Sequence, residues 1–230
     1  MDAGDTGRVP LPEATAAPLK VFLLGCFEVV RDDTPIPQAS WRRRRPADLL
    51  KLAALTPGRE LTREAVIEAL WPDKDPASGA NNLHRALYDL RQVLGGRWVD
   101  LERGRVRMSA EVWVDVDVFE AAAISGDPGA QEVAVALYRG DLSPEDPDSP
   151  WLASRRAALR ARLAGAALPL ARAAVARGDV PVAISLLRRV LEIEPAREEP
   201  HRLLARLLAE SGHPADALRQ LEACEAALRA

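Results

Sequence analysis

The clearest indication of fold in the N-terminal half of this chain is the segment Asn81-Asn82-Leu83-His84-Arg85-Ala86-Leu87-Tyr88-Asp89-Leu90-Arg91. On a helical wheel its apolar side chains gather on one side, and this periodicity continues from Ser78 to Leu94. The apolar stripe consists of Leu83, Ala86, Leu87, Leu90 and Leu94. The opposite face carries Ser78, Asn81, Arg85, Tyr88 and Gln92, with Asn82, His84 and Asp89 at its margins. The sequence therefore predicts an amphipathic helix over residues 78–94.

The flanking residues predict two earlier helices and a β-hairpin. The helices are expected over 46–55 and 62–70, the second with Thr62 as its N-cap. After Gly95-Gly96 the pattern alternates, and a hairpin over Trp98–Met108 with a Glu102-Arg103-Gly104 turn is expected. A strand over Leu19–Val30 and a short one near Pro35–Ala39 are predicted ahead of the helices.

This order of elements is typical of a winged helix-turn-helix. Most surface helices have a polar face, so such a face alone does not indicate a nucleic-acid partner. Here the face presents Asn, His, Arg and Tyr without a Lys/Glu ladder, and an arginine-bearing hairpin follows it, as in a reader of the major groove. The candidate DNA-contacting residues are Ser78, Asn81, His84, Arg85 and Tyr88 in the helix, Arg103 and Arg105 at the hairpin tip, and Arg42, Arg43, Arg44 and Arg45.

The arginine run Arg42–Arg45 precedes the first helix. Positive charge at a helix N-terminus opposes the helix dipole, and phosphate contacts would offset that cost. The whole chain carries a net charge of -3. However, residues 40–110 hold fourteen Lys or Arg against nine Asp or Glu, whereas residues 117–230 hold fourteen against seventeen. This distribution favours an anion-facing module joined to an acidic one.

The second half reads as helix throughout, with no strand expected after the junction near Val114–Phe119. A polar connection over 141–150 precedes a long helix that starts near Trp151. Four residue pairs recur at a separation of 34, which is the tetratricopeptide period. They are Ala171/Ala205, Gly178/Gly212, Ala183/Ala217 and Leu187/Leu221. Pro195 falls at the expected close of a repeat, although chance agreement in an Ala/Leu-rich bundle is the competing interpretation.

These residues resemble the SARP family, the antibiotic regulatory proteins of actinobacteria, which join an OmpR-type winged helix to a bacterial transcriptional activator domain. The resemblance rests on Leu19–Gly25, Leu49–Ala53, Pro57–Glu64, Ile67–Pro72, Asn81–Arg91 and Trp151–Arg156. It implies binding to double-stranded DNA at repeated promoter elements, usually as a pair of protomers, and activation through contacts to RNA polymerase. It also implies that 78–94 is the recognition helix and 98–108 the wing.

The expected fold is mainly α with small β elements. We expect a flexible tail over 1–18, a winged helix domain over 19–115, and a tetratricopeptide-like activator domain over 116–230. The chain stops at Leu228-Arg229-Ala230 within a helix, and we expect this end to expose apolar surface for a homodimer or a further domain.

Other classes of protein are less well supported. His84, His201 and His213 have no metal-ligand spacing, and phosphate loops and nucleophile elbows are absent from the sequence, so neither an enzyme nor a metal or cofactor site is predicted. His201 and His213 are expected at the surface or at helix starts, and Cys26 and Cys224 as small buried residues. No apolar run is long enough to span a membrane, and a cytoplasmic protein is expected. The alternative that stays open is a helical scaffold or ligand sensor with weak or no specific DNA binding.

Overall fold

The computed structural model describes residues 17–96 and 98–229, and these fall into two compact units. The first unit runs to Asp117 and also includes Glu145–Pro147, and the second holds Val118–Pro144 and the chain from Asp148 onward. The expected tail over 1–18 lies, up to residue 16, outside the described residues.

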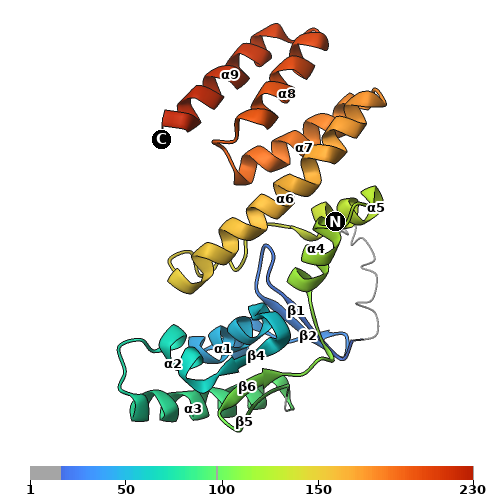
Figure 1. The fold of residues 1–230 in the computed structure, drawn as a ribbon. Coiled ribbons are helices and arrows are strands. Elements are labelled where there is room, and N and C mark those ends of the chain that lie inside the picture. The colour runs from blue at the N-terminus through green and yellow to red at the C-terminus, as the bar shows by residue number, and fades with distance from the viewer. Residues whose placement is uncertain (1–16, 97, 230) are drawn as a thin grey trace. The chain divides into compact units, whose positions relative to one another are not determined.

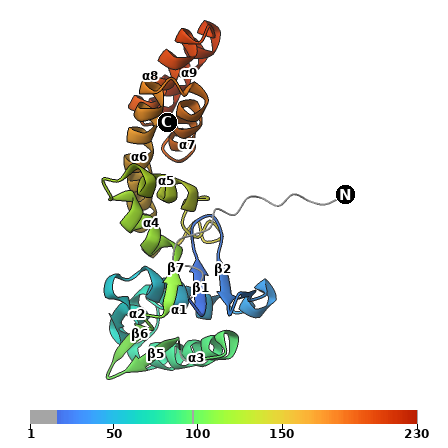
Figure 2. The same ribbon diagram turned by 90° about the vertical axis from the view of Figure 1, so that its right-hand side faces the viewer.

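A four-stranded sheet opens the first unit. Its strands are β1 (Leu19–Phe22), β2 (Glu28–Arg31), β3 (Thr34–Pro35) and β7 (Val112–Val114), in the order β3-β2-β1-β7. Neighbours β1 and β2 are antiparallel, whereas β1 and β7 are parallel, with Leu19 opposite Val112. Figure 2 shows β7, β1 and β2 side by side. The buried Asp115 carboxylate follows β7 and accepts hydrogen bonds from the backbone N–H groups of Leu23 and Leu24, so it closes the end of β1.

The prediction of one strand over Leu19–Val30 was wrong. The chain reverses between β1 and β2, where Gly25 has a φ of 90° that favours glycine. The short strand predicted near Pro35–Ala39 was also misplaced, because β3 ends at Pro35 and a 3-10 helix occupies Gln38–Trp41. An apolar run shows that a segment is buried, but it does not show where the segment turns.

Three helices and a second sheet complete the first unit (Figure 1). The helices are α1 (Arg44–Leu55), α2 (Arg63–Leu70) and α3 (Pro76–Leu94). The second sheet has the order β4-β6-β5, with β4 at Glu60–Thr62, β5 at Val99–Glu102 and β6 at Arg105–Met108. The predicted hairpin is confirmed, and so is Thr62 as N-cap, since its hydroxyl accepts from the Ala65 N–H at 3.2 Å. Strand β4 was not predicted; it lies between a 3-10 helix over Pro57–Arg59 and α2.

A buried lysine ties a later segment to α1. Lys51 is only 2% exposed, and its ammonium pairs with Asp146 at 2.7 Å and also with Glu145. The same ammonium lies 4.5 Å from the centroid of the Phe27 ring. Burying a charged ammonium group is costly unless carboxylates accept hydrogen bonds from it. The segment Glu145–Pro147 therefore completes the first unit despite its distance in sequence.

The second unit is helical in its described residues. Its helices are α4 (Asp115–Ala123, which starts at the end of the first unit), α5 (Pro128–Leu137), α6 (Pro150–Ala176), α7 (Val180–Ile193), α8 (Glu198–Glu210) and α9 (Pro214–Arg229). Gly178 and Gly212 turn the chain between α6 and α7 and between α8 and α9, with φ values of 77° and 83°. Ala171 and Ala183 are buried where α6 meets α7, which lets the two helices approach closely. The tetratricopeptide-like interpretation of the second half is confirmed.

A buried aromatic group anchors the start of α6. Tyr138 is fully buried, and its hydroxyl donates to Asp141 at 2.9 Å. Arg160 of α6 pairs with the same carboxylate, and this hydrogen bond is the main reason that the pKa of Asp141 lies below its usual range. Burial raises the pKa of Tyr138, with the neighbouring Asp141 as the second cause.

One prediction on a single residue was wrong. Cys26 is exposed, because it follows Gly25 in the turn between β1 and β2, although Cys224 is buried as expected. His201 lies in the first turn of α8, as expected for a helix-start residue, and is buried there with its ring nitrogens within hydrogen-bonding distance of the Pro195 carbonyl and of Gln220. His213 is exposed just before α9, as expected. None of the helices in the described residues is both long enough and apolar enough to cross a membrane.

Candidate nucleic-acid interface

Helix α3 is set by strong signals at both ends. Before its first turn, the Asp75 carboxylate accepts hydrogen bonds from the N–H groups of Ala77 and Ser78, at 3.1 and 3.0 Å. The Ser78 hydroxyl and then these backbone bonds lower the pKa of Asp75. Pro76 at the first helical position has a suitable fixed φ. Gly95 ends the helix with a left-handed φ of 69°. The observed helix starts two residues before the predicted one.

The crossing of α2 and α3 depends on a glycine that the sequence patterns did not reveal. A Cβ atom added at Gly79 would lie 2.4 Å from Cγ2 of Ile67 on α2. Only a residue without a side chain lets the two helices approach this closely. Gly79 therefore permits the close crossing of α3 and α2 within the helix-turn-helix.

The predicted two faces of α3 are confirmed. All five residues of the apolar stripe are buried: Leu83, Ala86, Leu87, Leu90 and Leu94. The side chains of Asn81, His84, Arg85 and Tyr88 are exposed, and Ser78 is half-buried. Tyr88 is 62% exposed, which is unusual for a large aromatic residue on a folded surface.

Arginines from the start of α1 meet the middle of α3. Arg43, Arg44, Arg45, Asn82 and Arg85 line one shallow hollow of about 330 Å³. Arg43 donates to the carboxylate of Asp89 on α3 at 2.6 Å, which joins the two helices and offsets one positive charge. Three of the four residues of the predicted arginine run thus meet Arg85 of the predicted helix face in one hollow.

Two more arginines of this hollow, Arg44 and Arg45, are paired with acidic side chains. Arg44 pairs with Asp48 at 3.6 Å and with Asp146 at 2.8 Å, and Arg45 pairs with Asp48 at 3.2 Å. Arg45 also lies 5.7 Å from the centroid of the Trp71 ring. Burial raises the pKa of Asp48, although the neighbouring Arg44 opposes this shift. These partners position the guanidinium groups while their outer edges stay exposed.

The wing has the turn that its sequence predicts. Arg103 and Gly104, at the tip between β5 and β6, have φ values of 49° and 75°, as a type I′ turn requires. Arg105 and Arg107 both pair with Glu60 of β4, at 2.8 and 2.6 Å. The hydrogen bond from Arg107 is the main reason that the pKa of Glu60 lies below its usual range.

The structure brings together some of the predicted site residues and adds others. Arg43, Arg44, Arg45 and Arg85 share the hollow, whereas Arg42 is exposed but does not line it. Sequence reasoning placed Asn82 at the margin of the polar face, yet it lies in the hollow. It also missed the pairing of Arg43 with Asp89, because residues 46 positions apart show no local pattern.

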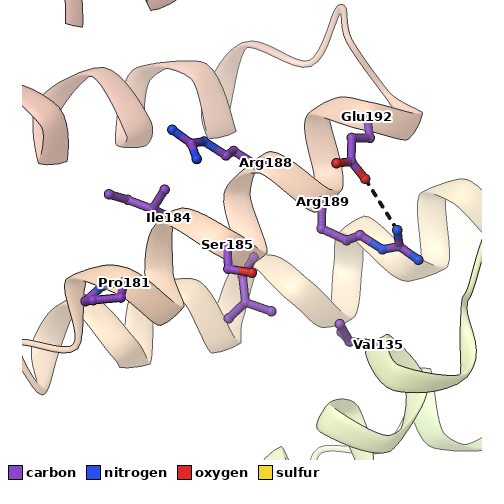
Figure 3. Close-up of a pocket in the computed structure, with 8 residues that line it drawn as sticks. Val135, Pro181, Ile184, Ser185, Arg188, Arg189 and Glu192 are labelled. Atoms are coloured by element: carbon purple, nitrogen blue, oxygen red, sulfur yellow. Dashed lines mark hydrogen bonds and ion pairs between the residues drawn. The ribbon is translucent and has the colours of Figure 1, made fainter. Parts of the chain in front are cut away.

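The second unit offers an open groove of about 500 Å³ between α5 and α7, which bears on the ligand-sensor alternative. Its lining includes Val135, Ile184, Arg188 and Arg189. Figure 3 shows Arg189 directed toward Glu192, with which it forms an ion pair at 3.3 Å. Within the described parts of the chain there is no cluster of three His, Cys, Asp or Glu residues that could hold a metal ion.

Known proteins similar to this chain are transcriptional regulators. EmbR of Mycobacterium tuberculosis is 30% identical over 78 residues, which are 34% of this chain and 19% of EmbR. MoaR1 of the same organism is 24% identical over 207 residues, which are 82% of this chain and 66% of MoaR1. This chain thus spans less than two thirds of the length of the first of these relatives.

A solved structure shares the fold. Mycobacterium tuberculosis EmbR, determined in complex with a low affinity phosphopeptide, superposes with a TM-score of 0.72 at 23% identity. The match covers 92% of this chain and 60% of that one. The model of the bacterial transcriptional activator domain matches residues 114–230, half of this chain. The chain therefore belongs to the SARP-type family of transcriptional regulators that carry the bacterial transcriptional activator domain.

Proposed function

We propose that this chain binds double-stranded DNA, with α3 in the major groove and the β5–β6 wing against the backbone or the minor groove. In this assignment residues 19–115 form the DNA-binding domain and residues 116–230 the activator domain. The observation that carries the proposal is the shared hollow of Arg43, Arg44, Arg45, Asn82 and Arg85, which joins the polar face of α3 to the arginine run.

Each group of residues has a role suited to its chemistry. Asn81, His84, Arg85 and Tyr88 reach base edges from the exposed face of α3, and Ser78 contacts the backbone near its start. Arg42–Arg45 hold phosphates, so that the anion offsets the unfavourable charge at the start of α1. Arg103 and Arg105 contact phosphates or the minor groove at the wing, and the ion pair with Glu60 keeps Arg105 in place.

The bound protein activates transcription in this proposal, as a pair of protomers on repeated promoter elements and through contacts to RNA polymerase. Support comes from the family alone, whose activator domain matches residues 114–230. The second candidate is a helical scaffold or ligand sensor. The groove between α5 and α7 favours this candidate. The pairing of Arg43 with Asp89 favours it too, because it offsets one positive charge on the proposed DNA-facing surface.

Selection from a pool of random duplex DNA, followed by a salt titration, separates the two candidates. Enrichment of a repeated element with a steep salt dependence is expected for the regulator. Replacing Arg85 by alanine is expected to weaken binding to the enriched element by about 1–3 kcal/mol. Weak salt-sensitive binding without enrichment, or an Arg85→Ala variant that binds like the wild type, would contradict the assignment.

A further inference from the structure

The last helix pair of the second unit carries an open apolar groove. It lies between α8 and α9, has a volume of about 540 Å³, and is lined mainly by alanine and leucine with Arg202 and Arg206 among its residues. Leu218 and Leu221 line it and are 63% and 43% exposed. Two such leucines side by side on a helix surface indicate a face built for burial.

The 34-residue repeat supplies a template for what covers this groove. Subtracting 34 from five of the eight lining residues gives residues of the same or a similar type on α6 and α7. The equivalent pairs are Ala171/Ala205, Arg172/Arg206, Ala183/Ala217, Ile184/Leu218 and Leu187/Leu221. In the earlier groove Leu187 is 0% exposed, because it lies in one core cluster with Leu204 and Leu208 of α8. Helix α8 lies beside α7 (Figure 1), and its side chains bury Leu187 in this way.

The earlier groove also shows which charge the covering helix carries at its start. Arg172 of α6 pairs with Glu199 in the first turn of α8. Its equivalent, Arg206, has a side chain that is 59% exposed, and its ion pair is with Glu210 on the same helix at 3.9 Å. Arg206 is thus placed where an acid at the start of an incoming helix would meet it.

We propose that the α8–α9 groove is a docking site for an amphipathic helix of a partner protein. The partner helix has an acid in its first turn and a Leu/Ala stripe, which is the pattern by which α8 fills the equivalent groove. Leu218 and Leu221 bury the stripe, while Arg206 fixes the direction and register of the helix. This surface is independent of the proposed DNA contact.

The test uses the whole chain and a labelled peptide with the sequence of residues 197–212, which contains α8. Saturable binding, followed by fluorescence anisotropy, is expected. Replacing Leu218 by Asp should weaken it at least about tenfold, because a buried leucine contributes roughly that much affinity. The matched control is Leu228→Asp, since Leu228 is 52% exposed on the same helix but does not line the groove.

A charge exchange tests the predicted direction. Arg206→Glu should weaken binding about fivefold, and a Glu199→Arg peptide should recover most of that loss on this variant alone. Arg219→Glu, on α9 outside the groove, is the control. Circular dichroism checks that each variant folds.

Three outcomes would overturn the proposal. The first is no saturable binding of the peptide. The second is equal loss of binding in the Leu218→Asp and Leu228→Asp variants. The third is concentration-dependent self-association of the chain that Leu218→Asp abolishes in analytical ultracentrifugation, because the groove would then hold a second copy of this chain.

Discussion

Replacing Asp89 by asparagine is expected to strengthen DNA binding. Arg43 donates to Asp89 at 2.6 Å, so in the wild type the carboxylate competes with a phosphate for this guanidinium and adds a negative charge to the surface proposed to face phosphates. Asparagine keeps the size of the side chain and removes the charge, which frees Arg43 for a phosphate. The Arg43 and Asp89 side chains are 59% and 22% exposed, so the lost pair costs the fold at most about 1 kcal/mol.

The expected gain follows from counterion release. One additional phosphate contact makes the slope of log K against log salt steeper by about 0.9. If the variant and the wild type bind equally at 1 M salt, this difference in slope makes the variant bind about eightfold more tightly than the wild type at 0.1 M salt. The Asp89→Asn variant should therefore bind any duplex about eightfold more tightly at 0.1 M salt.

The assay is a salt titration of binding to a fluorescent duplex of arbitrary sequence, so that no operator has to be known. The control is Glu111→Gln, which makes the same change of charge at an exposed position outside α1 and α3. An unchanged slope for Asp89→Asn, or an equal gain for Glu111→Gln, would show that Arg43 does not face the DNA backbone.

Three further predictions concern stability. Asp146→Ala leaves the buried Lys51 ammonium with one acid fewer and also removes a partner of Arg44, and we expect a loss of about 3 kcal/mol in urea unfolding. An unchanged midpoint would mean that these ion pairs do not stabilise the fold. Gly178→Ala places a side chain at a φ of 77° with no neighbour within 4 Å, so it should cost about 1 kcal/mol, whereas Gly126→Ala, equally open but without a positive φ, should not. The lowered pKa of Asp141 stabilises the fold above its ordinary pKa of 3.8, and this contribution should fade as the pH falls below about 4. Asp141→Asn should be less stable at neutral pH and lose less on acidification; parallel pH profiles would argue against the ion pair.

Local patterns predicted the helices and the wing well. Helix α3 follows from an apolar stripe repeated over about three turns, and the wing follows from alternation around a turn with Gly104. The strand over Leu19–Val30 was predicted as one piece because its residues are apolar on both sides of the turn at Gly25. Periodicity reports which side chains are buried, while the path of the backbone depends on partners elsewhere in the chain.

The candidate site was predictable in part. The exposed residues of α3 and the arginine run were identified by type and spacing. Their meeting in one hollow was not, since it depends on how α1 packs against α3. The pairing of Arg43 with Asp89 and the close approach of Gly79 to Ile67 also depend on that packing.

Sequence patterns alone were enough to predict the amphipathic helix α3, the β5–β6 hairpin, the 34-residue repeat and the resemblance to a family, because each depends on residues close together or at a fixed spacing. The burial of Lys51 against Glu145 and Asp146 could be seen only in the folded chain, and so could the exposure of Leu221 beside the burial of its repeat equivalent Leu187. Burial and pairing are properties of neighbours in space. Two leucines at the same position of a repeat differ only in whether another helix covers them.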